Sequence, residues 1–171
     1  YGLLFTVQKF SKNNLANARI ICYDNKLKTC SVPKGHGHIE QRESFLMNTN
    51  SKLRVALFFG GVSSEHDVSC VSASAWLRAL GQEPCADKYE VFPVGITKDG
   101  RWLACRPTPE TMADGSWEQG DCTPCVLSPD RKDHGIWLLK DGRAELVHID
   151  ICAPVMHGKN GEDGTIQGLF E

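Results

Sequence analysis

The feature that most limits what this chain can fold into is an apolar run that ends at a pair of glycines. Residues 53–59 have the sequence LRVALFF, and Gly60 and Gly61 follow directly. A nearly continuous apolar run suits a strand that is covered on both faces of its sheet. The chain is therefore predicted to build a sheet with helices packed against it.

A helix is predicted to follow this strand, from about Glu65 to Leu80. Its apolar residues recur at the spacing that places them on one helical face. These residues are Val68, Val71, Ala75 and Ala79. Ser64, with Asp67 three residues later, matches the looser form of the capping box and predicts the start of the helix.

Two further strands are predicted from runs rich in Val, Ile, Phe and Tyr. They cover Tyr89–Ile96 and Ile149–Met156, and Pro154 places the second at a sheet edge or at its own end. A strand, then a helix, then another strand predicts an α/β fold: a mainly parallel sheet with helices on both faces.

The segment between these strands is predicted to be less regular. Residues 105–135, rich in Pro, Gly and Asp, are expected to form an irregular connection. A hairpin is predicted for residues 136–147, with Asp141 and Gly142 at its turn.

Length and composition are those of an ordinary globular protein. At 171 residues there is room for one domain, with 41% apolar and 23% charged residues. No apolar run approaches the roughly 20 residues of a membrane helix, so a cytoplasmic protein is expected. The net charge of -2 gives no reason to expect nucleic acid as a partner.

The eight cysteines do not indicate a disulfide framework. Most of them lie singly in strand- or helix-like segments, where a free cysteine behaves as a small buried hydrophobe. Only Cys122 and Cys125 form a CxxC pair, and a zinc site normally needs a second pair or two histidines. A plain loop is the favoured interpretation of this pair, with a metal or redox role left as the lesser alternative.

The first 46 residues differ from the rest in charge and pattern. They carry seven Lys and Arg against three Asp and Glu, whereas residues 47–171 carry 12 against 18. They lack clear periodicity, and Met47 is the first methionine of the chain. We expect residues 1–46 to be a non-homologous leader, either untranslated upstream sequence or a poorly structured extension. The folded domain is expected to span residues 47–171.

Two loops carry the candidate chemistry, and each follows a predicted strand. The first covers residues 60–66 and the second residues 157–164. Because binding crevices of open α/β sheets lie at the carboxyl ends of the strands, both loops are expected to face one crevice.

Each loop also has an interpretation without function. Glu65, in the first helical turn, can attract a cation such as a substrate ammonium, or it can simply favour the helix N-terminus. The second loop holds His157 and three glycines, which allow close approach of a ligand or another domain. Its alternative is a tight solvated turn.

Three blocks of the chain form recognisable motifs. Residues 60–69 have the sequence GGVSSEHDVS, residues 88–102 KYEVFPVGITKDGRW, and residues 157–168 HGKNGEDGTIQG. In this order they resemble the motifs GG-x-S-x-E-x-x-V-S, KYEV-P-GIT-x-G-W and HG-x-x-GEDG-x-x-QG of the D-alanine–D-alanine ligase family. The resemblance implies a Rossmann-like pre-ATP-grasp domain, which this chain holds in truncated form.

The resemblance implies a reaction and a set of site residues. The family phosphorylates a first D-alanine with ATP and Mg²⁺ (Mn²⁺ is an alternative), and a second D-alanine attacks the acyl phosphate. Glu65 corresponds to the catalytic carboxylate that binds and orients the first D-alanine, and Val68, Ser69 and His157 complete the substrate-binding set. The supporting residues are Gly60, Gly61, Gly158, Gly161, Glu162 and Gly164.

The resemblance also implies what this chain does not hold. It ends within the last helix of the first domain, so the ATP-binding and metal-binding groups are assigned to absent domains and no metal ligand is expected here. The fragment alone is expected to be inactive, and the full-length enzyme to be a homodimer. A D-alanine–D-lactate ligase, suggested by LSPD at 127–130 and by residues 134–135, and a non-catalytic ligand-binding module remain alternatives.

Overall fold

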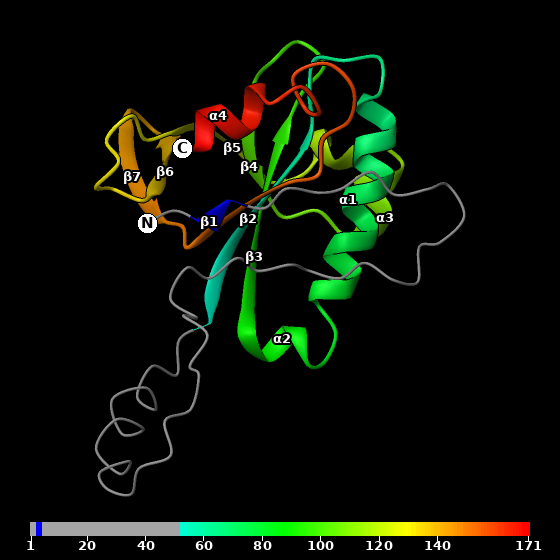
Figure 1. The fold of residues 1–171 in the computed structure, drawn as a ribbon, viewed down its shortest axis with the longest axis horizontal. Helices are drawn as coiled ribbons and strands as arrows, with labels where there is room; N and C mark the ends of the chain where they lie inside the picture. The colour runs from blue at the N-terminus through cyan, green and yellow to red at the C-terminus, as the bar shows by residue number, and fades with distance from the viewer. Residues whose placement is uncertain (1–2, 5–51) are drawn as a thin grey trace, which may run out of the picture.

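The structure is a computed structural model that describes residues 3–4 and 52–171. Figure 1 shows how its helices and strands are arranged. They are β1 (Leu3–Leu4), β2 (Leu53–Gly60), α1 (His66–Leu80), α2 (Cys85–Lys88), β3 (Tyr89–Ile96), β4 (Trp102–Cys105), α3 (Pro109–Ala113), the 3-10 helix η2 (Ser116–Gln119), β5 (Cys122–Leu127), β6 (Gly135–Lys140), β7 (Arg143–His148), β8 (Ile151–Pro154) and α4 (Thr165–Phe170).

The strands form one mixed sheet in the order β1-β8-β2-β3-β4-β5-β6-β7. The strands from β1 to β3 are parallel, and every pair from β3 to β7 is antiparallel. The α/β class is therefore confirmed, with a parallel half that follows the predicted pattern and an added antiparallel half. Short turns join β3 to β4 and β6 to β7, and a short turn reverses the chain whereas a parallel pair needs a long crossover. The longer segment between β4 and β5, which contains α3 and η2, also returns the chain antiparallel.

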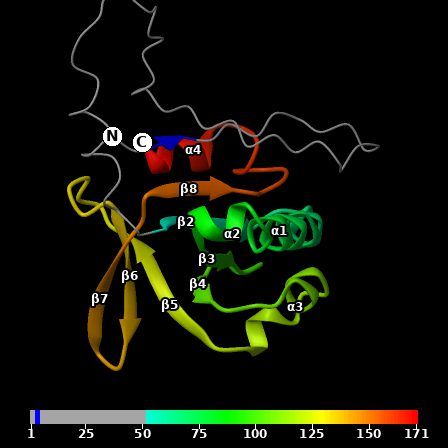
Figure 2. The ribbon, with the colours of Figure 1, turned by 90° about the horizontal axis from the view of Figure 1, so that it is seen from below.

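Alternate residues of β2 enter two different cores. Val55, Leu57 and Phe59 pack with α1, α3 and η2, whereas Ala56 and Phe58 pack with residues of α4 on the other face. Figure 2 shows α1 and α3 together on one side of the sheet and α4 apart from them. This burial on both faces is why the run is apolar without alternation, and it confirms that helices cover both faces.

Helix α1 packs against the sheet through a different face from the one predicted. Val68 and Val71 are 51% and 55% exposed, and Ala79 is exposed as well. The buried residues are His66, Ser69, Cys70, Ala73, Ser74 and Leu80. The prediction was wrong because it followed Val and Ala and left out the polar and sulfur-containing residues His66, Ser69, Cys70 and Ser74, which are buried. Small residues such as Ser, Cys and Ala let the helix backbone lie close to the sheet.

The predicted capping box is also wrong. The N-cap of α1 is Glu65, and no side chain caps this end of the helix. A complete capping box occurs instead at α3, where Thr108 and Thr111 bond each other's backbone N–H groups.

The connection over residues 105–135 contains more structure than predicted. It holds α3, η2 and β5, and β5 pairs with β4 on one side and β6 on the other. Cys122 and Cys125 therefore lie in a strand and not in a loop. Pro124 and the surrounding turn residues concealed this strand, because proline is rare in strands that are paired on both sides.

Other local predictions are confirmed. Strand β3 has the predicted bounds, and β6 and β7 form the predicted hairpin. Both turn residues, Asp141 and Gly142, have positive φ, as a type I′ turn requires. Pro154 is the last residue of β8.

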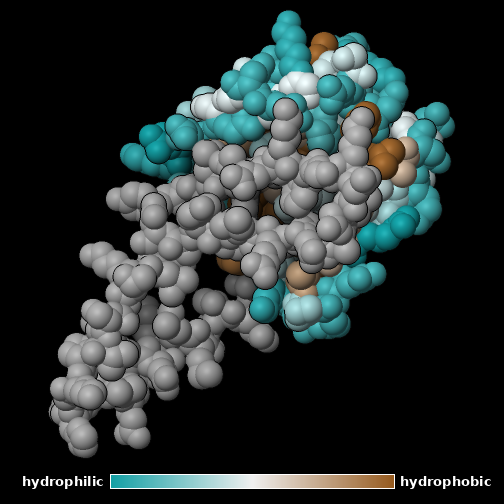
Figure 3. Space-filling view, turned by 45° about the vertical axis from the view of Figure 1, so that its right-hand side comes forward, coloured by the Kyte–Doolittle hydropathy of each residue, from teal (hydrophilic) through white to brown (hydrophobic). Residues whose placement is uncertain are grey.

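The predicted leader lies almost entirely outside the described residues. Of residues 1–46, the structure describes only Leu3 and Leu4, which form β1 and pair in parallel with β8. No helix in the described part of the chain is long and apolar enough to cross a membrane. In the coloured part of the surface in Figure 3, hydrophilic residues predominate, with small, separate hydrophobic patches among them.

The corrected face of α1 predicts opposite effects for the same change at two nearby positions. Ala73→Asp places an unpaired charge in a fully buried site and is expected to lower the free energy of unfolding by about 3 kcal/mol or more. Val71→Asp, on the exposed face, is expected to change it by less than about 0.5 kcal/mol. Chemical denaturation followed by circular dichroism measures both. A greater loss for Val71→Asp would restore the original prediction.

Candidate functional site

The two predicted loops meet at the carboxyl ends of β2 and β8, which are neighbouring parallel strands. The hydroxyl of Ser63 in the first loop donates a hydrogen bond of 3.0 Å to the carbonyl oxygen of His157 in the second. The same hydroxyl accepts a bond of 3.1 Å from the backbone N–H of Glu65. Ser63 therefore connects Glu65, the N-cap residue of α1, to His157, the first residue of the second loop.

Three charged or titratable side chains converge where the loops meet. Glu65, His157 and Glu162, called here the acidic cluster, offer ligand atoms that lie within 4.8 Å of one another. His157 is half-buried, and Glu65 and Glu162 are exposed. Two carboxylates in so small a space attract a cation to the cluster.

Both ring nitrogens of His157 have partners. Nδ1 lies 3.3 Å from the Glu162 carboxylate, and Nε2 lies 3.0 Å from the Ser72 hydroxyl. The imidazole is thus held between the second loop and α1, with its ring orientation set from both sides.

Ser63 and Ser72 also belong to this site, and neither was predicted as a site residue from the sequence. A signal for Ser72 was available, because Glu65, Ser69 and Ser72 stand at the i, i+4, i+7 spacing of one helical face. Ser63 is the fixed serine of the GG-x-S-x-E motif, which could have drawn attention to it, but its contact with a carbonyl oxygen 94 positions away could not be read from the sequence.

Ser69 has a different place from the one predicted. It is completely buried, and its hydroxyl donates to the carbonyl oxygen of Val155 at 2.5 Å and accepts from the backbone N–H of Gly60 at 2.8 Å. Its single proton is donated inside the fold, and the side chain has no exposed surface that a ligand could reach. Ser69 therefore joins the ends of β2 and β8 to α1, which is a positioning role and not direct substrate contact.

Val68 is half exposed and stands one helical turn after Glu65. Its predicted place in a substrate-binding wall stays a prediction.

Backbone contacts and backbone angles within the fold account for the predicted supporting glycines. Gly60 has a φ of 81°, and a Cβ there would lie 2.3 Å from the carbonyl oxygen of Ile96. At Gly161 an added Cβ would lie 2.8 Å from the backbone of Met156. Backbone approaches so close leave no room for a side chain. Positive φ angles also occur at Gly61, Gly158 and Gly164.

Asp163 shapes the second loop from within. Its carboxylate accepts backbone N–H bonds from Asn160 at 3.0 Å and Thr165 at 3.1 Å. These bonds, with a bond from the Thr165 side chain as the largest cause, hold the pKa of Asp163 below its ordinary value. This residue keeps the loop closed on itself, and the adjacent Glu162 is left to face His157.

An open pocket of about 490 Å³ lies beside the loops. Its wall includes Gly61 of the first loop, Asn160 of the second and the apolar side chains of Trp102, Met156 and Ile166. None of the three acidic-cluster residues lines it, so the pocket is separate from the cluster.

The donor set of the acidic cluster limits what it can bind. Two carboxylate oxygens and one imidazole nitrogen suit a divalent metal ion or an ammonium group. They do not suit the phosphates of a nucleotide, because the carboxylates repel them. The expectation that no residue here is a metal ligand stays a prediction.

The fold and site together define an α/β domain with a cation-attracting site at the carboxyl ends of parallel strands. The family model described as D-ala D-ala ligase N-terminus matches residues 54–171. The chain belongs to this family.

Similar proteins include ligases with different second substrates. A D-alanine–D-alanine ligase of Caldicellulosiruptor bescii is 46% identical over 71% of this chain and 32% of its own length. A putative D-alanine–D-lactate ligase of Streptomyces coelicolor is 48% identical, with the same coverage. The solved VanG D-Ala:D-Ser ligase of Enterococcus faecalis matches 70% of this chain and 33% of its own with a TM-score of 0.61 and 34% identity. The chain thus spans about a third of the curated relatives it matches.

The burial of Ser69 predicts its contribution to stability. Ser69→Ala leaves the N–H of Gly60 and the carbonyl of Val155 without this partner, and it is expected to cost about 1–3 kcal/mol of unfolding free energy. Ser64→Ala is the matched control and is expected to be neutral, because Ser64 is exposed and caps no helix. Urea titration measures both, and equal effects would contradict the assignment.

Proposed function

We propose that this chain is the part of a D-alanine–D-alanine ligase that holds the first D-alanine, in an ATP-dependent reaction that supplies D-alanyl-D-alanine for peptidoglycan synthesis. The observation that carries the proposal is the acidic cluster. It brings the carboxylate at the start of α1 together with the histidine and glutamate of the second loop. Both loops belong to the region that matches the family model.

Glu65 is proposed to bind the ammonium group of the first D-alanine. It stands at the N-cap of α1, where the partial positive charge of the helix holds a carboxylate in place. A charge-assisted hydrogen bond between ammonium and carboxylate orients the amino acid as well as binding it. Glu65 is therefore the residue of this chain to which we give a catalytic role.

His157 is proposed to face the carboxylate of the same D-alanine. Nε2 reaches the ligand by exchanging the Ser72 hydroxyl for a carboxylate oxygen. Glu162 stays hydrogen-bonded to Nδ1 and so holds the ring in place, which makes Glu162 a positioning residue. Fixed donors near a reacting carboxylate lower the cost of bringing two anions together.

ATP and Mg²⁺ (or Mn²⁺) supply the phosphoryl transfer that activates the D-alanine carboxylate in this proposal. The acidic cluster does not fit nucleotide phosphates. We assign ATP and its metal to regions corresponding to the other two thirds of the relatives, the ATP-grasp part of the enzyme. A homodimer and a cytoplasmic location stay predictions.

The second substrate has more than one candidate. The relatives include enzymes named for D-alanine and D-lactate at 46% and 48% identity, and a solved structure named for D-serine at 34%. D-alanine–D-lactate ligase is therefore the second candidate function. Product analysis of a complete enzyme offered D-alanine with either D-alanine or D-lactate distinguishes the two.

The 171-residue chain alone is expected to show no ligase activity. Its acidic cluster can orient D-alanine but has no suitable place for ATP. The assay is phosphate release with ATP and Mg²⁺, with and without D-alanine, and the complete Caldicellulosiruptor bescii ligase is the positive control. D-alanine-dependent phosphate release by the chain would contradict this division of roles.

The role of Glu65 can be tested in a complete enzyme. Residues 54–171 replace the matching third of the Caldicellulosiruptor bescii ligase, and Glu65→Gln is then introduced. Loss of one charged hydrogen bond is expected to lower kcat/KM for the first D-alanine roughly 10- to 100-fold. Glu90→Gln, which removes a glutamate paired with Arg54, is the matched control and should keep the activity of the parent chimera. An equal loss in both variants would refute the assignment.

The alternative of a non-catalytic binding module makes a different prediction. Such a module binds its ligand unaided, so calorimetry of the chain with D-alanine would show binding that Glu65→Ala abolishes. The ligase proposal expects weak or undetectable binding, because much of the ligand's surroundings comes from other parts of the enzyme. Tight binding together with an inactive chimera would favour the module.

A further inference from the structure

The CxxC motif does not form a working pair in this fold. In a strand, successive side chains alternate between faces, so residues three apart point to opposite sides. Cys125 is buried in the core that contains Phe58 and Ile136, whereas Cys122 packs against the core that contains Phe59. The sheet thus separates the two thiols that the sequence places together.

Cys122 has another partner, which is far from it in the sequence. Cys105 of β4 is directly opposite Cys122 of β5 in the antiparallel register. Both cysteines belong to the same core, with Cys105 buried in it and Cys122 packed against it. Directly opposed residues have Cα atoms about 4.5 or 5.5 Å apart, and both values lie in the roughly 4.4–6.8 Å range of disulfides.

We propose that Cys105 and Cys122 are a modification site, which a low-molecular-weight disulfide such as oxidised glutathione converts into a reversible cross-strand disulfide.

The reaction proceeds by two exchanges. The more exposed Cys122 loses its proton, and its thiolate attacks a sulfur of glutathione disulfide, which forms a mixed disulfide and releases one glutathione thiolate. The Cys105 thiolate then attacks the Cys122 sulfur, forms the cross-strand bond and releases the second glutathione. The two protein thiols lose two protons and two electrons, and one glutathione disulfide is reduced to two thiols.

Burial sets the rate of this reaction. It raises the pKa of the Cys122 thiol and raises that of Cys105 further, so little thiolate is present near neutrality. Oxidation is therefore slow at neutral pH, and it accelerates as the pH rises because a larger fraction of each thiol becomes thiolate.

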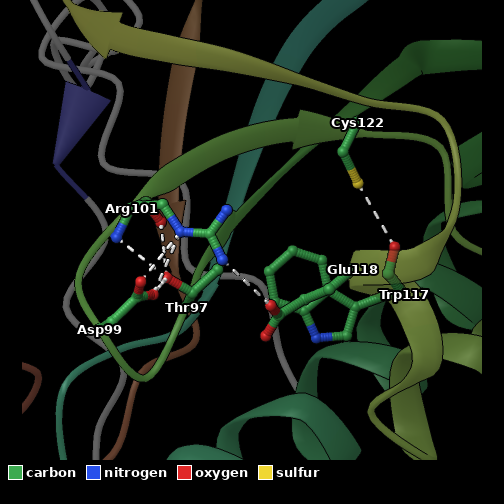
Figure 4. A network of polar contacts seen from close by, with 6 residues as sticks. All are labelled: Thr97, Asp99, Arg101, Trp117, Glu118 and Cys122. Atoms are coloured by element: carbon green, nitrogen blue, oxygen red, sulfur yellow. Dashed lines mark hydrogen bonds and ion pairs between the residues drawn. The ribbon is translucent and has the colours of Figure 1, made fainter.

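The bond would close the segment that carries α3 and η2. In the reduced chain the Cys122 thiol donates to the carbonyl oxygen of Trp117 at 3.3 Å (Figure 4). Trp117 is buried edge-to-face against Phe59, with ring centres 4.9 Å apart. Oxidation removes this thiol donor and replaces it with a covalent link between β4 and β5. The disulfide thus fixes the strands that flank η2. In the reduced chain an ion pair of 3.7 Å between Arg101 and Glu118 also ties η2 to the segment before β4.

The test uses the 171-residue chain, incubated with excess oxidised glutathione at pH 7 and at pH 8.5 until its mass is constant. Non-reducing peptide mapping is expected to recover a Cys105–Cys122 link that has lost two hydrogen atoms, and to show faster formation at pH 8.5. The midpoint of thermal unfolding is expected to rise by about 5 °C, because the link constrains the unfolded chain. Dithiothreitol is expected to reverse both changes.

Variants separate this pair from the other cysteines. Cys105→Ser and, as the less buried alternative, Cys122→Ser are each expected to abolish the link and the thermal shift. Cys125→Ser is the matched control and should retain both. A Cys122–Cys125 link, a mixed disulfide that persists at Cys122, or an unchanged unfolding midpoint after complete linkage would each overturn the proposal.

Discussion

The structure depends on one buried hydroxyl, that of Ser69. It joins the backbone N–H of Gly60, at the end of β2, to the carbonyl of Val155, just after β8, and it belongs to α1. Two strand ends and a helix are therefore fixed by a side chain with no exposure to solvent. Both loops of the candidate site begin at these strand ends, which the ladder of β2 and β8 holds side by side, and this contact adds α1 to the pair before any ligand binds.

Helix α1 packs against the sheet and, on neighbouring turns, also carries residues of the candidate site. Its small buried residues let it lie close to β2, and its first turn presents Glu65 to the second loop. Ser72, two turns later, reaches the imidazole of His157. A bulkier buried face would move the helix outward and separate Glu65 from its partners. The residues that pack the helix therefore also set the geometry of the acidic cluster.

Much of the fold could be predicted because it follows from local patterns. Strand β3 and the hairpin of β6 and β7 follow from β-rich runs and a turn with two positive φ angles. The packing face of α1 and strand β5 could not be predicted in this way. Whether a small polar residue is buried depends on the element that packs against it. The strand that contains Pro124 is likewise stabilised by its neighbours β4 and β6.

The sequence by itself determined the motif blocks, the family they indicate and the two loops that carry Glu65 and His157. The tertiary structure alone decided the partners: Ser72 and Glu162 for His157, Val155 for Ser69, and Cys105 instead of Cys125 for Cys122. The reason is physical. Local patterns specify which residues face one way along an element, whereas register and packing specify what lies opposite them.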